Sequence, residues 1–189
     1  MTDKNEHKND SPHVCPHRFS FILDNWLRKI FQSPKKVAGP FIKPGDTVID
    51  IGSGPGYFTI DMAKMAGRDG KVIAVDLQEH MLDFVKKKAQ KHNVADQVIL
   101  HKCETDSIGL DAQADFILAF YMVHETSDQE AFFKEVKTML KPGGKILVSE
   151  PPFHVKKTDF DNMLVLAENA GLKAISFPKG RKSMSVVLS

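Results

Sequence analysis

The chain has 189 residues, of which 42% are apolar and 26% charged, and its formal net charge is +2. These proportions are typical of one globular domain; they exclude wholesale disorder and favour no polyanionic partner. The two cysteines, Cys15 and Cys103, are too few for a disulfide framework. We find neither a signal-peptide pattern nor an apolar run of about 18 residues, so we expect a cytoplasmic protein without membrane contact.

Three regions of different character follow one another. Residues 1–11 are polar and charged, which predicts a flexible tail. Residues 12–42 contain an apolar stripe at helical spacing over Phe19–Phe31, which predicts a helical cover on the main domain. Residues 43–189 form that main domain, where strand and helix patterns alternate.

The alternation predicts an α/β fold, doubly wound, with a mostly parallel seven-stranded sheet and helices on both faces. Helices are expected at 58–66, 79–92 and 159–170. Another begins at the capping box of Ser127 and Glu130 and ends where Pro142-Gly143-Gly144 turns the chain. The strands are expected at 47–51, 71–76, 98–101, 115–120, 145–149, 172–177 and 184–188.

A glycine-rich loop follows the first strand, where residues 50–56 read DIGSGPG. Glycine lets the backbone turn sharply and lets a ligand approach closely, and the helix that follows adds unpaired N–H groups. Asp76 ends the second strand, about 20 residues later, where nucleotide-binding folds hold an acid for ribose hydroxyls. A helix N-cap is the alternative role for Asp76.

Both NAD and S-adenosylmethionine bind to such a loop, and their charges distinguish them. Asp50 stands directly before the glycines. An anion at that point suits a cationic ammonium group better than a pyrophosphate. The pattern therefore favours S-adenosylmethionine.

Three motifs resemble those of the class I S-adenosylmethionine-dependent methyltransferases, which have a Rossmann-like fold. DIGSGPG resembles the first motif, VIAVD at 72–76 the second strand with its acid, and LKPGGK at 140–145 the turn before the fifth strand. The resemblance spans about 44–149 and implies S-adenosylmethionine as cofactor, S-adenosylhomocysteine as product, and an antiparallel last strand. It does not identify the methyl acceptor.

The resemblance also implies where the cofactor binds: the methionine end at the loop, the ribose at Asp76 and the adenine near Glu104. This chain has Cys103-Glu104-Thr105 where Gly/Ala-Asp-Ala is commoner, and Ser53 where Cys is frequent. The expected cofactor-binding residues are Asp50, Gly52, Ser53, Gly54, Pro55, Gly56, Tyr57, Asp76, Leu77, Glu104, Thr105 and Phe120.

The segment YMVHE at 121–125 resembles the HH or HE segment of the ubiquinone- and menaquinone-biosynthesis methyltransferases. His124 is a candidate general base, because imidazole accepts a proton near neutral pH. Its alternative is a partly buried histidine bonded to a backbone carbonyl. His154, which follows the fifth strand and should point towards the same strand-end face, is a further catalytic candidate. Tyr121 is another and should line the pocket, with an ordinary packing role as its alternative.

His13, Cys15 and His17 place three soft-metal ligands within five residues, without the separated pairs of a structural zinc site, so we expect no metal. This HVCPH segment resembles the HVCPW opening of a group of bacterial and archaeal methyltransferase-like proteins. We expect it to fold over the cofactor mouth as part of a lid.

We therefore expect a methyltransferase acting on a small-molecule acceptor. The pocket must be closed by residues 11–40 or by a second subunit, which would make a homodimer.

Three alternative functions stay open. A nucleic-acid methyltransferase would need a basic surface joining the lysine-rich segments near 86–91 and 179–182. An NAD-dependent oxidoreductase would have no use for Asp50, and a non-catalytic S-adenosylmethionine-binding protein would have no acceptor cavity.

Overall fold

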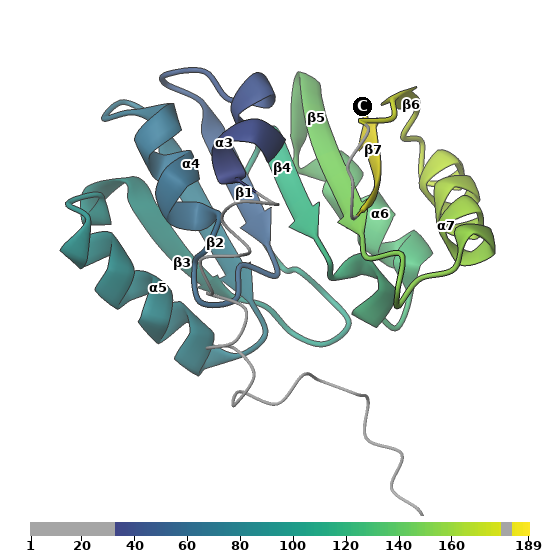
Figure 1. Ribbon diagram of the computed structural model, residues 1–189, viewed down its shortest axis with the longest axis horizontal. Helices are drawn as coiled ribbons and strands as arrows, with labels where there is room; N and C mark the ends of the chain where they lie inside the picture. The colour runs from purple at the N-terminus through teal and green to yellow at the C-terminus, as the bar shows by residue number, and fades with distance from the viewer. Residues whose placement is uncertain (1–32, 179–182) are drawn as a thin grey trace, which may run out of the picture.

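The computed structural model describes residues 33–178 and 183–189. Seven strands form one sheet in the order β3-β2-β1-β4-β5-β7-β6 (Figure 1). Strands β1 to β5 pair in parallel, and β7 runs antiparallel to both of its neighbours, which confirms the predicted fold class. The strands are β1 (Thr47–Ile51), β2 (Lys71–Asp76), β3 (Val98–Lys102), β4 (Ala114–Phe120), β5 (Leu140–Glu150), β6 (Ala174–Ser176) and β7 (Met184–Leu188).

Helices cover both faces of the sheet, because successive residues of each central strand point to opposite sides and both sides are apolar. Ile49, Ile117 and Ile146 share one core with apolar residues of α6 and α7. Val48 and Phe116 belong to a second core on the side of α3 and α4. The helices are α3 (Pro34–Val37), α4 (Thr59–Ala66), α5 (Glu79–Lys91), α6 (Gln129–Thr138) and α7 (Lys157–Asn169), with 3-10 turns η2 (Gly39–Phe41), η3 (Ala95–Gln97) and η4 (Val123–Glu125).

The strand order reverses between β1 and β4, which are neighbours in the sheet but not in the chain. The arrowheads of β1, β4 and β5 point to the same edge of the sheet (Figure 1). Open α/β sheets bind ligands in the crevice outside this carboxyl edge, beside the point of reversal. The predicted site residues Asp50, Asp76 and His124 all lie at or just beyond strand ends on this edge.

Two local predictions were wrong. Helix α6 is capped by Asp128, whose side chain accepts a hydrogen bond from the Ala131 N–H, and not by Ser127. Pro142-Gly143-Gly144 lies inside β5, which begins at Leu140, and does not precede the strand. The strand accommodates these residues by a register shift against β4, since partners Ala114 and Leu140 are followed by Phe116 and Lys145.

The predicted tail at 1–11, the helix over Phe19–Phe31, the HVCPH segment and the basic residues at 179–182 lie outside the described residues. Of the predicted cover at 12–42, the structure describes 33–42, which hold α3 and η2. Phe41 stacks on Phe116 with ring centroids 5.3 Å apart, so this segment packs on the sheet. Within 33–178 and 183–189, no helix is long and apolar enough to cross a membrane.

The register shift in β5 depends on the small size of Gly144. A Cβ atom at this position would lie 2.8 Å from the Ala114 carbonyl oxygen and 2.9 Å from that of Lys141. We expect Gly144→Ala to lower the free energy of unfolding by about 1–3 kcal/mol, measured by urea denaturation. Lys145→Ala, at the exposed next position, is the control and should change it by less than about 0.5 kcal/mol. Equal stability of both variants would contradict this account of the strand.

Candidate active site

The glycine-rich loop after β1 is tied to the neighbouring strand. The N–H groups of Gly52 and Ser53 both donate to the Val75 carbonyl oxygen, at 2.9 and 3.0 Å. Gly52, Gly54 and Gly56 have φ angles of 69°, 50° and 80°, in the left-handed region that favours glycine. A Cβ on Gly52 would also lie 2.9 Å from the Met122 side chain. The loop therefore needs these glycines to keep its shape.

Asp50 is buried beside the loop, with 2% of its surface exposed. Its Oδ2 accepts a hydrogen bond of 2.6 Å from the Thr59 hydroxyl, which lies in the first turn of α4. Asp50 and Val48 point to the same side of the sheet, so the alternation of the strand brings the carboxylate to this helix. Sequence analysis gave Thr59 no role, although a hydroxyl at a helix start is a recognisable donor.

Asp76 accepts backbone hydrogen bonds with both carboxylate oxygens. The Gly54 N–H donates to Oδ2 at 2.8 Å, and the Gln78 N–H donates to Oδ1 at 2.9 Å. Burial raises the pKa of Asp76, and the two N–H groups oppose this effect. A carboxylate offers about four acceptor positions, so these bonds leave capacity for further donors such as vicinal hydroxyls. Asp76 thus joins the loop, β2 and the segment before α5.

We call Asp50, the glycine-rich loop and Asp76 the cofactor cradle. The remaining predicted cofactor residues differ in burial. Leu77 and Pro55 are half-buried and Tyr57 is buried, whereas Glu104 and Thr105 are exposed just beyond β3, the neighbour of β2. Phe120, at the end of β4, packs against Phe58 and Tyr121 with ring centroids 4.6 and 4.2 Å away. All of these residues follow strands that end on the carboxyl edge.

Two features of the loop fit a bound cofactor. The Ser53 hydroxyl is buried and has no hydrogen-bond partner among the residues that the structure describes. A Cβ on Gly54 would meet no atom within 4 Å, so the chain is open to an approaching ligand there. Asp50, the loop and Asp76 together offer an anion, a polar turn and a diol acceptor, which is the donor and acceptor set that S-adenosylmethionine requires.

The turn after β4 presents His124 at the same edge. Tyr121 has a φ of 60°, unusual for a residue with a side chain, and its N–H donates to the Ser149 carbonyl oxygen at 2.8 Å. This sharp turn leads into η4, which carries His124. The His124 side chain is 27% exposed, so it is partly buried and still accessible from solvent.

His124 is bound to a buried acid that sequence analysis missed. Its Nδ1 lies 2.5 Å from Oε2 of Glu150, and its backbone N–H donates to Oε1 at 3.2 Å. The Glu150 side chain is only 1% exposed. The hydrogen bond to Glu150 raises the pKa of His124, against the opposing effect of burial. A carboxylate, and not the backbone carbonyl considered as an alternative, is thus the partner of this histidine.

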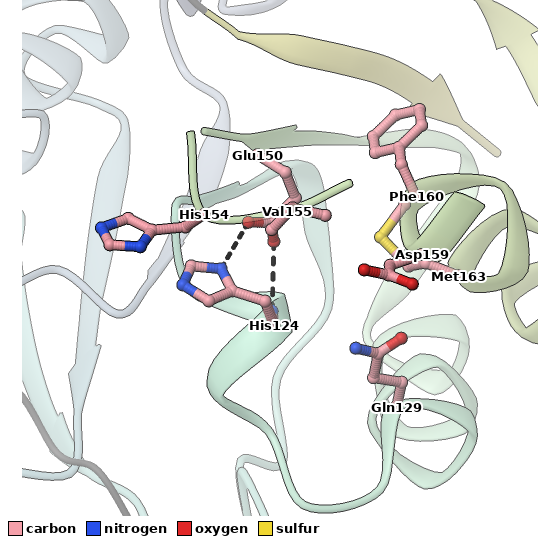
Figure 2. Close-up of a pocket in the computed structure, with 8 residues that line it drawn as sticks. All are labelled: His124, Gln129, Glu150, His154, Val155, Asp159, Phe160 and Met163. Carbon is pink, nitrogen blue, oxygen red and sulfur yellow. Dashed lines mark hydrogen bonds and ion pairs between the residues drawn. The ribbon is translucent and has the colours of Figure 1, made fainter. Parts of the chain in front are cut away.

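A cavity of about 320 Å³ lies beside this pair (Figure 2). His154, the other predicted catalytic histidine, is exposed, and its ring lies 6.3 Å from that of His124, with 13° between the planes. Figure 2 shows Gln129, Asp159, Phe160 and Met163 across the cavity from the two histidines. The lining consists of His124, Gln129, Glu150, His154, Val155, Asp159, Phe160 and Met163.

Comparison with known families agrees with this geometry. A family model described as a methyltransferase domain matches residues 42–180. The chain therefore belongs to the methyltransferase domain family, and the class I S-adenosylmethionine-dependent type predicted from the motifs is confirmed. Among solved structures, a SAM-dependent methyltransferase from Aquifex aeolicus is similar with a TM-score of 0.82 and 28% identity, covering 92% of this chain and 97% of that one.

Curated relatives carry one recurring name. A demethylmenaquinone methyltransferase from Lactobacillus johnsonii is 27% identical over 77% of this chain and 59% of its own length. One from Bacillus cereus is 28% identical over 58% of this chain and 46% of its own length. The chain thus spans about half the length of these relatives.

The solved structure of the [4+2]-cyclase SpnF shares the fold. It is 18% identical, with a TM-score of 0.69, and the match covers 82% of this chain and 62% of that one.

The position of Asp76 leads to a binding prediction. If its free acceptor positions hold the ribose, Asp76→Ala should weaken S-adenosylhomocysteine binding by about 1.5–3 kcal/mol, roughly 10- to 150-fold, by equilibrium dialysis. Asp83→Ala, which removes an exposed carboxylate on α5, is the matched control and should bind normally. A folded Asp76→Ala variant with unchanged affinity would refute the assigned role.

Proposed function

We propose that the protein transfers the methyl group of S-adenosylmethionine to a small molecule that loses a proton from an O–H or an acidic C–H group. The observation that carries this proposal is the imidazole of His124, which a buried carboxylate orients at the same sheet edge as Asp50 and Asp76. The proposed methyl-donor site and the proposed proton acceptor therefore lie at the same edge of the sheet.

The cofactor, when bound, supplies an electrophilic methyl carbon on a sulfonium, so the enzyme's main task is alignment. Asp50 provides negative charge for the amino group at the methionine end, and the Ser53 hydroxyl provides a further polar contact. Asp76 takes the ribose hydroxyls. Phe120 ends β4, shortly before the turn that carries His124, and its ring packs on Phe58, which follows the glycine loop. We assign this ring to the boundary of the methionine portion.

His124 is the proposed proton acceptor, through Nε2. Figure 2 shows this nitrogen on the side of the ring away from Glu150. Oε1 of Glu125 lies 4.0 Å from Nε2, too far for a hydrogen bond. The neutral imidazole is the active form, and the pKa of His124 is raised, so turnover should increase with pH through that raised value. His154, with its ring 6.3 Å away, is the second candidate. Tyr121, the third, stacks on Phe120 and is not among the residues that line the cavity.

The acceptor class follows from the relatives rather than from the cavity. Two relatives are called demethylmenaquinone methyltransferases, and this chain shares their family. Demethylmenaquinone in its reduced form carries ionisable hydroxyl groups, which match a histidine base in chemistry. It is therefore the first acceptor to test.

The role of His124 can be measured by release of S-adenosylhomocysteine in the presence of reduced demethylmenaquinone. His124→Ala should lower turnover roughly 10²–10⁴-fold and leave S-adenosylhomocysteine affinity unchanged. His92→Ala, which removes an exposed histidine just after α5, is the control and should keep full turnover. Near-normal turnover of His124→Ala would mean that alignment alone suffices and that His124 is not the base.

A further inference from the structure

We propose that Glu150 is a positioning residue that keeps the proton of neutral His124 on Nδ1 and leaves Nε2 as the lone pair that receives the acceptor's proton. This inference rests on the proposed function, because it gives His124 the role of base. It adds a residue that no sequence motif indicated and a specific protonation geometry for the site.

The contact geometry fixes which nitrogen bears the proton. Oε2 of Glu150 lies 2.5 Å from Nδ1, and a carboxylate offers only acceptors, so Nδ1 must be the donor. In neutral imidazole one ring nitrogen carries the hydrogen and the other accepts. With Nδ1–H committed to Glu150, Nε2 is the basic nitrogen.

Glu150 also fixes the place of the ring, because it holds the same residue at two points. Its second oxygen, Oε1, accepts the backbone N–H of His124 at 3.2 Å. Main chain and imidazole are thus both attached to one carboxylate, and a shift of η4 would break both bonds. This arrangement restricts the rotation of the ring more than a single contact would.

The carboxylate itself is held rigidly. Glu150 is the last residue of β5, where it pairs with Met184 of β7, and its side chain is 1% exposed. The preceding residue, Ser149, accepts the Tyr121 N–H, so the end of β5 is bound to both ends of the turn that carries His124. Burying a carboxylate without a partner is costly, so loss of the imidazole contact would be unfavourable. The hydrogen bond between Glu150 and His124 is strong for the same reason.

Other charged groups face His124 as well, and they define the controls. Glu125 lies on the Nε2 side at 4.0 Å, and partial burial raises its own pKa. His154 lies beside the ring, and Asp159 lines the same cavity from α7. Glu150 and Glu125 both raise the pKa of His124, with Glu150 the larger contributor. Removing the Glu150 charge should therefore lower that pKa, whereas removing the Asp159 charge should have little effect.

The test is ¹⁵N NMR of the full chain labelled at histidine, with the His124 signals assigned by their loss in His124→Ala. Above its pKa, wild-type His124 should show protonated Nδ1 and unprotonated Nε2. In Glu150→Gln, whose amide can donate or accept, the two tautomers should mix, and the His124 pKa should fall because the acid that raises it is gone. Asp159→Asn, a matched loss of carboxylate in the same cavity, should keep the wild-type tautomer and pKa of His124.

Turnover gives the second readout. The rise of turnover with pH should begin at lower pH in Glu150→Gln, while its plateau should fall between those of wild type and His124→Ala. Glu150→Asp keeps the charge but shortens the reach; it carries the test if Glu150→Gln fails to fold, and should shift the tautomer balance in the same direction.

Unchanged tautomer and pKa in the folded Glu150 variants would overturn the inference about Glu150. Full turnover of His124→Ala would instead overturn the proposed function.

Discussion

Burying a carboxylate costs several kcal/mol unless suitable donors surround it. This chain buries one near the carboxyl end of each of three strands: Asp50 on β1, Asp76 on β2 and Glu150 on β5, with exposures of 2, 8 and 1%. Asp50 is stabilised by the Thr59 hydroxyl of α4. Asp76 accepts backbone N–H groups of the glycine loop and of the segment before α5. Glu150 is paired with His124 of η4. The acids therefore connect the strand ends to the surrounding loops.

This arrangement separates what the fold provides from what the residues provide. The same fold occurs in a [4+2]-cyclase, so a doubly wound sheet with this strand order does not by itself specify methyl transfer. The family match and the acid at the end of β1 support methyl transfer here, since a pyrophosphate would be repelled by Asp50. The proposed proton acceptor belongs to a different pair, His124 just beyond β4 and Glu150 at the end of β5.

Much of the fold could be predicted from the sequence, because strands buried on both faces read as short apolar runs and the helices between them are amphipathic. The glycine loop and Asp76 could be singled out from the sequence because each belongs to a recognisable motif, although Gly54 and Asp76 are 22 residues apart. The His124–Glu150 contact could not be predicted, since no motif marks Glu150 and only the parallel pairing of β4 with β5 brings the two residues together. Similarly, Pro142-Gly143-Gly144 has the composition of a turn, but a register shift places it inside a strand.

The charge and hydrogen-bonding groups around Asp50 and Asp76 suit a sulfonium amino-acid nucleoside and not a dinucleotide. Isothermal titration calorimetry of the full chain against S-adenosylmethionine, S-adenosylhomocysteine and NADH tests this claim most directly. We expect both S-adenosyl compounds to bind with about one site per chain and NADH to give no heat of binding. Binding of NADH without binding of S-adenosylmethionine would contradict the account.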